Sequence, residues 1–504
     1  MSSARIVLDP AFTVGRLHRR VFGSFVEHLG RCVYDGIYEP GHATADQDGF
    51  RGDVLELVKE LGVSTIRYPG GNFVSGYRWE DGVGPKDERP RRLDLAWHST
   101  ETNQVGLHEF ARWNRLAGSE TMYAINLGTR GELDALDVLE YANVPSGSAF
   151  SDQRVANGDE QPLDIRMWCL GNEMDGPWQL GHRSAEDYGK LASRTAKAMR
   201  QIDPGVELVV CGSSSSSMPT FGSWERTVLE HTYEDVDFIS CHAYYHPGDG
   251  DMDSFLASSV DMDGFIRKVV ETADSVGAAL KSDKKIMISF DEWNVWYQDD
   301  WEAQATTFSI DEWPVAPRLL EDHYSVADAV VVGNLLITLL QHADRVKSAS
   351  IAQLVNVIAP IMTEPGGPAW RQTIFFPFAL TSRLAHDRVL QLAVESPTHS
   401  TAKYGDVATV DAVATVDDAT GATSVFLVNR SRTDTIDVTI ALPADSALSI
   451  AETHTISDDD IDAKNTLDDQ ERVAPAPNES ATVTDGVLTV TLPPVSWTAI
   501  ALTA

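Results

Sequence analysis

The chain has 504 residues, of which 43% are hydrophobic and 23% are charged, a composition typical of a well-packed globular protein rather than a disordered one. Its 75 acidic and 40 basic residues give a formal net charge of -35. Such an acidic surface repels polyphosphate and anionic lipid, which argues against nucleic acid and membrane surfaces as partners.

Neither export nor membrane insertion is indicated by the sequence. The N-terminal residues show no apolar run behind a basic start, and no segment approaches the roughly 18 to 20 apolar residues that span a bilayer. The four cysteines are widely spaced and form no CxxC pair, which suggests reduced thiols rather than a disulfide framework. We therefore expect a cytoplasmic protein.

Short apolar runs alternate with helical patterns between residues 20 and 384. Unbroken apolar runs are typical of parallel strands that are buried on both faces. Eight such runs can be recognised, at residues 21–23, 63–67, 122–126, 165–169, 207–211, 238–241, 286–290 and 351–354.

Helices are expected between these runs. Residues 53–61 carry apolar side chains at helical spacing and end at Gly62, and Ser184 and Ser325 each stand at the start of a further amphipathic segment. Eight strand-helix repeats predict a (β/α)8 barrel over residues 20–384. An open doubly wound sheet would also fit the alternation, but no GxGxxG motif follows any of the strands.

After residue 385 the helical patterns disappear. Short β-branched runs separated by turns, at 407–416, 423–428, 436–442 and 487–492, predict a C-terminal β-sandwich over residues 385–504. The strand-like run at 5–8, within residues 1–19, is expected to join that sandwich.

Two of the predicted barrel strands end in a glutamate. Strand four continues into Gly171-Asn172-Glu173, and strand seven continues into Asp291-Glu292-Trp293. Barrel enzymes act at the carboxyl ends of their strands, where side chains from several strands converge. Either glutamate alone could be a surface carboxylate. Together they can supply the protonated and the ionised carboxyl that hydrolysis of a glycosidic bond requires.

Further motifs point to a particular family. The two glutamate motifs, together with the segments 22–28 (FGSFVEH), 67–77 (RYPGGNFVSGY) and 352–361 (AQLVNVIAPI), resemble glycoside hydrolase family 51 of clan A, the α-L-arabinofuranosidases, in their intracellular bacterial type. The resemblance covers essentially the whole chain. It implies a retaining, exo-acting enzyme that releases terminal non-reducing α-L-arabinofuranosyl residues from arabinose-containing oligosaccharides. Glu292 would be the nucleophile and Glu173 the general acid/base.

The resemblance also implies residues that hold the sugar. Asn172 matches the position that binds the sugar 2-hydroxyl, and Glu27 and Asn72 match positions that bind other furanose hydroxyls. Gln353 matches a further sugar ligand, and Tyr244 matches a tyrosine that hydrogen-bonds the nucleophile. Simpler interpretations remain: residues 70–72 as a tight turn, Gln353 as a satisfied barrel amide, and Glu27 as a structural partner of Arg67.

Several aromatic and histidine positions receive weaker predictions. Trp97 and Trp296 match tryptophans that line the pocket and the leaving-group side, although a tryptophan is more often a core residue. Trp168 and Trp293 are expected to serve packing alone. His242 is expected to support the site by hydrogen bonding rather than to act as a base.

No cofactor or metal is expected, because the sequence has no HExxH, no closely spaced Cys/His set and no EF-hand loop. The expected partner is an arabinofuranosyl oligosaccharide, and the resemblance implies a homo-oligomer, a hexamer. The linkage preference and the leaving group stay open; the variable segments 246–259 and 297–320 would shape what lies beyond the arabinose.

Two alternatives remain. A related clan A enzyme, such as a β-xylosidase or an endoglucanase, would share the barrel and the glutamates, although Glu27, Asn72 and Gln353 together favour arabinofuranose. A catalytically silent sugar-binding protein is disfavoured because both glutamates and their surrounding motifs are intact.

Overall fold

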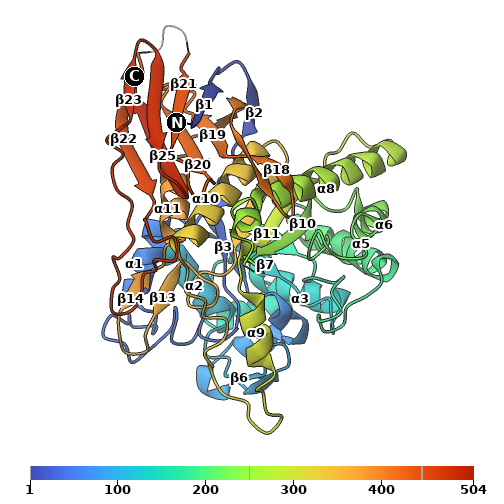
Figure 1. Ribbon diagram of the computed structural model, residues 1–504. Helices are drawn as coiled ribbons and strands as arrows, with labels where there is room; N and C mark the ends of the chain where they lie inside the picture. The colour runs from blue at the N-terminus through green and yellow to red at the C-terminus, as the bar shows by residue number, and fades with distance from the viewer. Residues whose placement is uncertain (1, 249, 444–446, 504) are drawn as a thin grey trace.

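The protein was analysed as a computed structural model, which describes residues 2–248, 250–443 and 447–503. A barrel surrounded by helices forms one part of the molecule, and a layered β structure that contains both chain ends lies against it (Figure 1). No helix in the described ranges has the length and the apolar character needed to cross a membrane.

Parallel strands form a closed barrel, as predicted. Within the described residues, eight strands follow one another in chain order around it, and β12 pairs with β3 to close the ring. They are β3 (Gly23–Phe25), β4 (Thr65–Tyr68), β7 (Glu120–Ala124), β8 (Met167–Cys169), β9 (Glu207–Val210), β10 (Phe238–Tyr245), β11 (Met287–Val295) and β12 (Val346–Ile351).

Two of the predicted strands are displaced in the structure. Residues 19–22 form a short 3-10 helix, and the first barrel strand follows it at Gly23–Phe25. The eighth strand is Val346–Ile351, so the run predicted at 351–354 begins where that strand ends. The true strand escaped the search for apolar runs because it carries Ser348 and Ser350, whose side chains are nevertheless fully buried.

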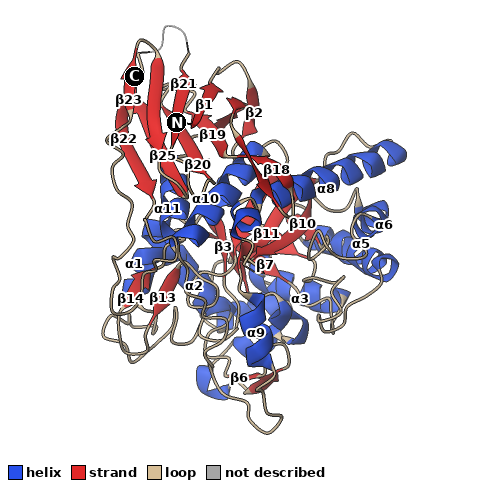
Figure 2. Ribbon diagram, viewed as in Figure 1, coloured by secondary structure: helices blue, strands red, loops and turns tan. Residues whose placement is uncertain are grey.

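Helices surround the barrel (Figure 2). The three predicted starts and stops are confirmed: Gly62 ends α1 with a left-handed φ of 75°, and Ser184 and Ser325 cap α5 and α10 by accepting from the backbone N–H three residues on. The helices are α1 (Gly52–Leu61), α2 (Leu107–Ala117), α3 (Glu132–Asn143), α4 (Ala149–Ala156), α5 (Ala185–Ile202), α6 (Ser223–Thr232), α7 (Met252–Leu256), α8 (Ser259–Leu280), α9 (Gln298–Ala305), α10 (Val326–Gln341) and α11 (Phe375–Leu384).

Two sheets pack face to face beside the barrel. One has the strand order β16-β1-β21-β24-β23 and the other β2-β15-β19-β20-β25-β22. Alternate side chains of both sheets, such as Ile6, Val438 and Leu427, fill the apolar layer between them. The strands are β1 (Ser2–Val7), β2 (Thr13–Arg16), β15 (Arg388–Leu390), β16 (Ala393–Glu395), β19 (Val410–Val416), β20 (Thr423–Asn429), β21 (Ile436–Ala441), β22 (Ser449–Ile456), β23 (Thr482–Thr484), β24 (Val487–Leu492) and β25 (Ser496–Thr503).

The N-terminal strand and helix α10 connect the two parts of the molecule. Strand β1 runs parallel to β21 and antiparallel to β16. On the barrel side, the ring of Trp497 lies against Gly333 of α10, where a Cβ atom would come within 2.3 Å of the indole. A glycine at this position therefore allows the helix and the sheet to approach closely.

Three small hairpins extend from this framework. They are β5–β6 (Arg92–Asp94 and Ser99–Glu101), β13–β14 (Ile361–Thr363 and Ala369–Arg371) and β17–β18 (Thr398–Thr401 and Gly405–Ala408). The β17–β18 hairpin leaves the β-sheet part of the chain and lies close to α8 and the end of β10 (Figure 1).

Candidate active site

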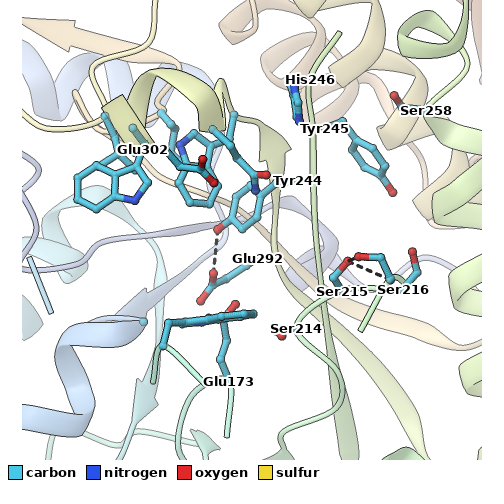
Figure 3. Close-up of a pocket in the computed structure, with 18 of the residues that line it drawn as sticks. Glu173, Ser214, Ser215, Ser216, Tyr244, Tyr245, His246, Ser258, Glu292 and Glu302 are labelled. Atoms are coloured by element: carbon cyan, nitrogen blue, oxygen red, sulfur yellow. Dashed lines mark hydrogen bonds between the residues drawn. The ribbon is translucent and has the colours of Figure 1, made fainter. Parts of the chain in front are cut away.

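A cavity of about 1070 Å³ opens at the carboxyl ends of the barrel strands (Figure 3). The predicted site residues converge on it from different strands and loops. Those that line the cavity are Glu27, Asn72, Trp97, Glu173, Tyr244, Glu292, Trp296 and Gln353. Asn172 is buried next to it, where its side chain contacts Arg67, Asn72 and Gln179.

Glu173 stands in a tight turn directly after β8. Gly171 and Glu173 both have positive φ values, 97° and 41°, so the chain reverses sharply and directs the carboxyl group into the cavity. One of its oxygens lies 2.9 Å from His242 Nδ1, and the other accepts a hydrogen bond of 2.6 Å from Trp178 Nε1. The side chain is almost completely buried.

Glu292 lies in β11 and faces Glu173 (Figure 3). Its Oε1 accepts from the Arg67 guanidinium at 2.6 Å, and its Oε2 accepts from the Tyr244 hydroxyl at 2.8 Å. Burial raises the pKa of Glu292 and the charge of Glu173 adds to this effect, whereas His242, Arg67 and Tyr244 counteract it. Arg67 and Tyr244 therefore stabilise the ionised form of a carboxyl group that burial alone would neutralise.

His242 lies between the two glutamates. Its Nδ1 is 2.9 Å from Glu173 Oε1 and 3.6 Å from Glu292 Oε2, and its Nε2 is 3.1 Å from Asp291 Oδ1. Burial acts to lower the pKa of His242, but the surrounding carboxylates raise it well above its ordinary value. The three surrounding carboxyl groups therefore favour the protonated, cationic form of the buried imidazole.

The site contains a group of possible metal ligands. It consists of one nitrogen or oxygen atom from each of Glu173, His242 and Glu292, and these three atoms lie within 4.8 Å of one another. A doubly protonated imidazole offers no lone pair, however, so His242 in its cationic form is not a metal ligand. The grouping is better described as two carboxyl groups joined by a shared cation.

Glu27 also lines the cavity, close to Glu292. Its Oε1 accepts from the Phe73 backbone N–H and from Trp97 Nε1, both at 2.9 Å, and its Oε2 accepts from Gln353 Nε2 at 2.9 Å. Burial raises the pKa of Glu27 to about 7. The alternative that Glu27 pairs with Arg67 is wrong, because the guanidinium instead contacts Glu292 and the Asn172 amide oxygen.

The Gly70-Gly71-Asn72 segment passes close to both acidic groups. A Cβ atom on Gly70 would lie 2.8 Å from the Glu27 side chain, and one on Gly71 would lie 3.1 Å from Glu292 Oε1. Glycines are therefore needed where this segment passes between Glu27 and Glu292, in addition to any turn that they form. Asn72 follows directly and lines the cavity.

The tryptophans differ in their contacts. Trp97 donates to Glu27 and packs edge-on against Trp301, with ring centroids 5.4 Å apart, whereas Trp296 packs edge-on against the Tyr244 ring at 5.1 Å. Trp168 and Trp293 are fully buried, in agreement with the packing role expected for them.

Three site residues were missed or underestimated. Arg67 was considered only as a strand residue, as part of a motif and as a structural partner of Glu27, although a charged side chain inside a buried strand is itself a signal of function. His242 contacts both glutamates and is therefore more central than predicted. Trp178 is 53% exposed and donates to Glu173, and nothing in its sequence context distinguished it from other loop tryptophans.

Known proteins match the chain over its whole length. Two family models match, the α-L-arabinofuranosidase 1 domain over residues 57–250 and the α-L-arabinofuranosidase C-terminal domain over residues 291–496. An exo-α-(1→6)-L-arabinofuranosidase of Bifidobacterium longum is 63% identical, with 99% of this chain and 97% of the relative covered. An intracellular exo-α-(1→5)-L-arabinofuranosidase of Streptomyces lividans is 60% identical, with 99% and 75% covered.

A solved structure agrees with this assignment. A family 51 α-L-arabinofuranosidase from Bifidobacterium longum superimposes with a TM-score of 0.96 at 52% identity and covers 99% of both chains. The chain therefore belongs to the α-L-arabinofuranosidases of glycoside hydrolase family 51 and is a glycoside hydrolase.

Proposed function

We propose that the enzyme removes terminal α-L-arabinofuranosyl groups with retention of configuration, with Glu292 as nucleophile and Glu173 as general acid/base. The observation that carries this proposal is the approach of the two carboxyl groups, whose nearest ligand atoms lie within 4.8 Å of each other and of His242. Retaining glycosidases place their carboxyl groups about 5 to 5.5 Å apart, whereas inverting ones leave about 6.5 to 9.5 Å for a water molecule.

The charges of the buried cluster favour one protonated carboxyl group. Arg67 and a protonated His242 supply two positive charges, and Asp291, Glu173 and Glu292 supply up to three negative ones. The cluster is neutral when one carboxyl group is protonated, and a buried cluster is most stable close to neutrality. Each of the two glutamates accepts from one cation and one neutral donor: Arg67 and Tyr244 for Glu292, His242 and Trp178 for Glu173. The roles are therefore assigned from the positions of the two motifs, which make Glu173 the proton donor.

The reaction then follows as a double displacement. Glu173 gives its proton to the glycosidic oxygen as the bond to the anomeric carbon breaks, and Glu292 forms an ester with that carbon. The ester removes the negative charge of Glu292, so Glu173, now ionised, can take a proton from water. That water attacks the anomeric carbon, releases arabinose and restores Glu292.

The sugar-binding roles are part of the same proposal. Glu27, Asn72 and Gln353 would bind furanose hydroxyls, and Trp97 and Trp296 would line the pocket. Asn172, held by Arg67, would contact the 2-hydroxyl, where a hydrogen bond can strengthen as positive charge develops on the ring. Tyr244 would hold the nucleophile in place.

The names of the relatives support exo action but differ in linkage. The 63% identical relative is named for α-(1→6) bonds, and the 60% identical one for α-(1→5) bonds. Relatives this similar share their catalytic residues far more readily than their leaving-group contacts, so we assign linkage preference to the leaving-group side of the cavity. The substrate would be an arabinofuranosyl oligosaccharide.

Three broader predictions belong to the proposal. The word intracellular in several relatives' names supports a cytoplasmic location. A homo-hexamer is expected from the family, and light scattering after size-exclusion chromatography would test it. The division into an N-terminal strand (1–19), a barrel (20–384) and a β-sandwich (385–504) is the domain arrangement that we propose.

The test is hydrolysis of a panel of 4-nitrophenyl glycosides: α-L-arabinofuranoside, β-D-xyloside, α-L-arabinopyranoside and β-D-glucoside. We expect a strong preference for the arabinofuranoside. Preference for a pyranoside would favour the related clan A enzymes and overturn the furanose roles of Glu27, Asn72 and Gln353. Absence of any turnover would favour a silent sugar-binding protein.

A further inference from the structure

The cavity extends well beyond the two glutamates. Its volume of about 1070 Å³ lies at the upper end of the roughly 300 to 1,000 Å³ typical of small-molecule sites and exceeds what one pentose needs. Away from Glu27, the cavity is lined by hydroxyl groups of the 214–217 loop, by the end of β10 and by the turn of the β17–β18 hairpin. Apart from Tyr244, these residues take no part in the proposed reaction.

Two consecutive tyrosines separate the catalytic centre from the outer part of the cavity. Side chains alternate along a strand, so Tyr244 at the end of β10 reaches Glu292 while Tyr245 points to the other side. The Tyr245 hydroxyl donates to Asp261 Oδ2 at 3.1 Å, and Ser216 Oγ donates to Asp261 Oδ1 at 3.0 Å. Figure 3 shows Tyr245 and Ser216 on the same side of the pocket, away from Glu302.

The β-sheet part of the chain supplies the remaining wall. The turn of the β17–β18 hairpin carries Lys403 and Tyr404, which both line the cavity. The hairpin is fixed to the barrel because the Lys403 backbone N–H donates to Ser254 Oγ at 3.0 Å. The Lys403 ammonium lies 5.2 Å from the centre of the Tyr404 ring, and its side chain is exposed. We call Ser216, Tyr245, Asp261, Lys403 and Tyr404 the outer annex.

The outer annex is connected to the acid/base side of the catalytic centre. Asp175 lies two residues after Glu173, and its Oδ2 accepts from both the backbone N–H and the hydroxyl of Ser214, at 3.0 and 3.1 Å. Ser214 itself lies between Glu173 and Ser216 in Figure 3. A leaving group that Glu173 protonates therefore meets the Ser214 and Ser216 hydroxyl groups, which both line the cavity, between the catalytic centre and the annex.

We infer that the outer annex binds the sugar units of the leaving group that lie beyond the first one, so that the β17–β18 hairpin sets a preference for longer oligosaccharides. This inference rests on the proposed function. A carboxylate that accepts from sugar hydroxyls, an ammonium that donates to them and an aromatic ring for the apolar sugar face are the groups that recognise neutral sugars. Lys403 and Tyr404 thereby determine substrate length without contacting the reacting bond.

The test compares substrates with no, one and two sugars in the leaving group. They are 4-nitrophenyl α-L-arabinofuranoside, arabinobiose and arabinotriose, the last two in the linkage that wild-type enzyme cleaves best. Lys403→Ala and Tyr404→Ala are measured beside Lys268→Ala, a control that removes an exposed lysine from α8. Thermal unfolding of each variant checks that the fold is kept.

We expect kcat/KM for arabinotriose to fall about 3- to 10-fold in both annex variants. A fall of this size corresponds to the loss of one or two hydrogen bonds or of one stacking contact with the sugar. Values for the 4-nitrophenyl substrate should stay within 2-fold of wild type, and Tyr404→Phe should retain the preference for arabinotriose. Equal losses on all three substrates, or no change on arabinotriose, would overturn the inference. Failure of wild-type enzyme on the 4-nitrophenyl substrate would instead overturn the proposed function.

Discussion

The two sides of the cavity are built differently. On the side of Glu27, the side chains are buried and joined by hydrogen bonds: Glu27 accepts three, of which Trp97 and Gln353 each donate one. On the side of the outer annex, loops and a hairpin from another part of the chain supply hydroxyl groups and an exposed lysine. A preorganised site resists change, whereas a loop-built site can vary without disturbing the chemistry.

This difference predicts that contacts with the leaving group can change without loss of the reaction. Substitutions next to Glu27 or Glu292 would leave buried charges without partners, which is costly. Substitutions of Lys403 or Tyr404 in the annex change side chains of a hairpin that lies outside the barrel strands. The difference between the two sides is tested most strongly by removing groups from the buried side. The loss of activity is then compared between substrates with different leaving groups.

The largest effect is expected for Glu292→Ala. Without the nucleophile no glycosyl ester can form, so kcat should fall by about 10⁴-fold or more on every substrate, whatever the leaving group. Azide should restore turnover by attacking from the vacated position, with a product of inverted configuration identified by NMR. Glu271→Ala, on the exposed surface of α8, is the matched control.

Glu173→Ala should cost less and should depend on the leaving group. General acid catalysis contributes typically 10²- to 10⁴-fold, so oligosaccharides should lose about that much, whereas 4-nitrophenol, which departs without a proton, should lose far less in its first step. Azide rescue should here give a product of retained configuration. If Glu173→Ala gave the inverted azide and Glu292→Ala the retained one, the two roles would be exchanged.

Tyr244→Phe isolates one hydrogen bond to the nucleophile. The hydroxyl lies 2.8 Å from Glu292 Oε2, and a bond to a charged group contributes about 1.5 to 3 kcal/mol, so a loss of about 10- to 150-fold in kcat/KM is expected on all substrates. Tyr245→Phe is the informative comparison, because that hydroxyl donates to Asp261 instead. A larger loss in Tyr245→Phe on the 4-nitrophenyl substrate would contradict the separation of the two sides.

The buried side of the site and the barrel strands could largely be predicted from the sequence. The barrel was predicted because its buried strands are apolar. Two strands were misplaced: β3, which follows a short 3-10 helix, and β12, where buried Ser348 and Ser350 interrupt the apolar run. The two catalytic glutamates lie at strand ends, so position along the chain was enough to propose them. Glu27, Asn72 and Gln353 were predicted from the resemblance of their motifs to the family.

The annex could not be predicted in the same way. Ser216, Asp261 and Tyr404 are far apart in the chain, and each alone is an ordinary loop, helix or turn residue. Ser216 and Asp261 meet through a hydrogen bond between a loop and α8, and the docking of the β17–β18 hairpin on Ser254 adds Tyr404 to the same cavity. Likewise, the cationic state of His242 depends on three carboxyl groups from different segments, which no local pattern reveals.

The smallest effect concerns the pH dependence of sugar binding by Glu27. Burial raises its pKa to about 7, so the carboxylate takes up a proton as the pH falls through that value and loses capacity to accept from sugar hydroxyls. KM for the 4-nitrophenyl arabinofuranoside should therefore rise several-fold, up to about 10-fold, as the pH is lowered from 8 to 5.

In Glu27→Gln, which cannot titrate, KM should be high at every pH, and the ratio of variant to wild-type KM should decline toward acidic pH. Asn72→Ala, which removes a neighbouring sugar contact without removing the titrating group, should raise KM by a constant factor. A pH-independent ratio for Glu27→Gln would show that Glu27 stays in one protonation state over this range, and the buried side would then be less sensitive to pH than its burial implies.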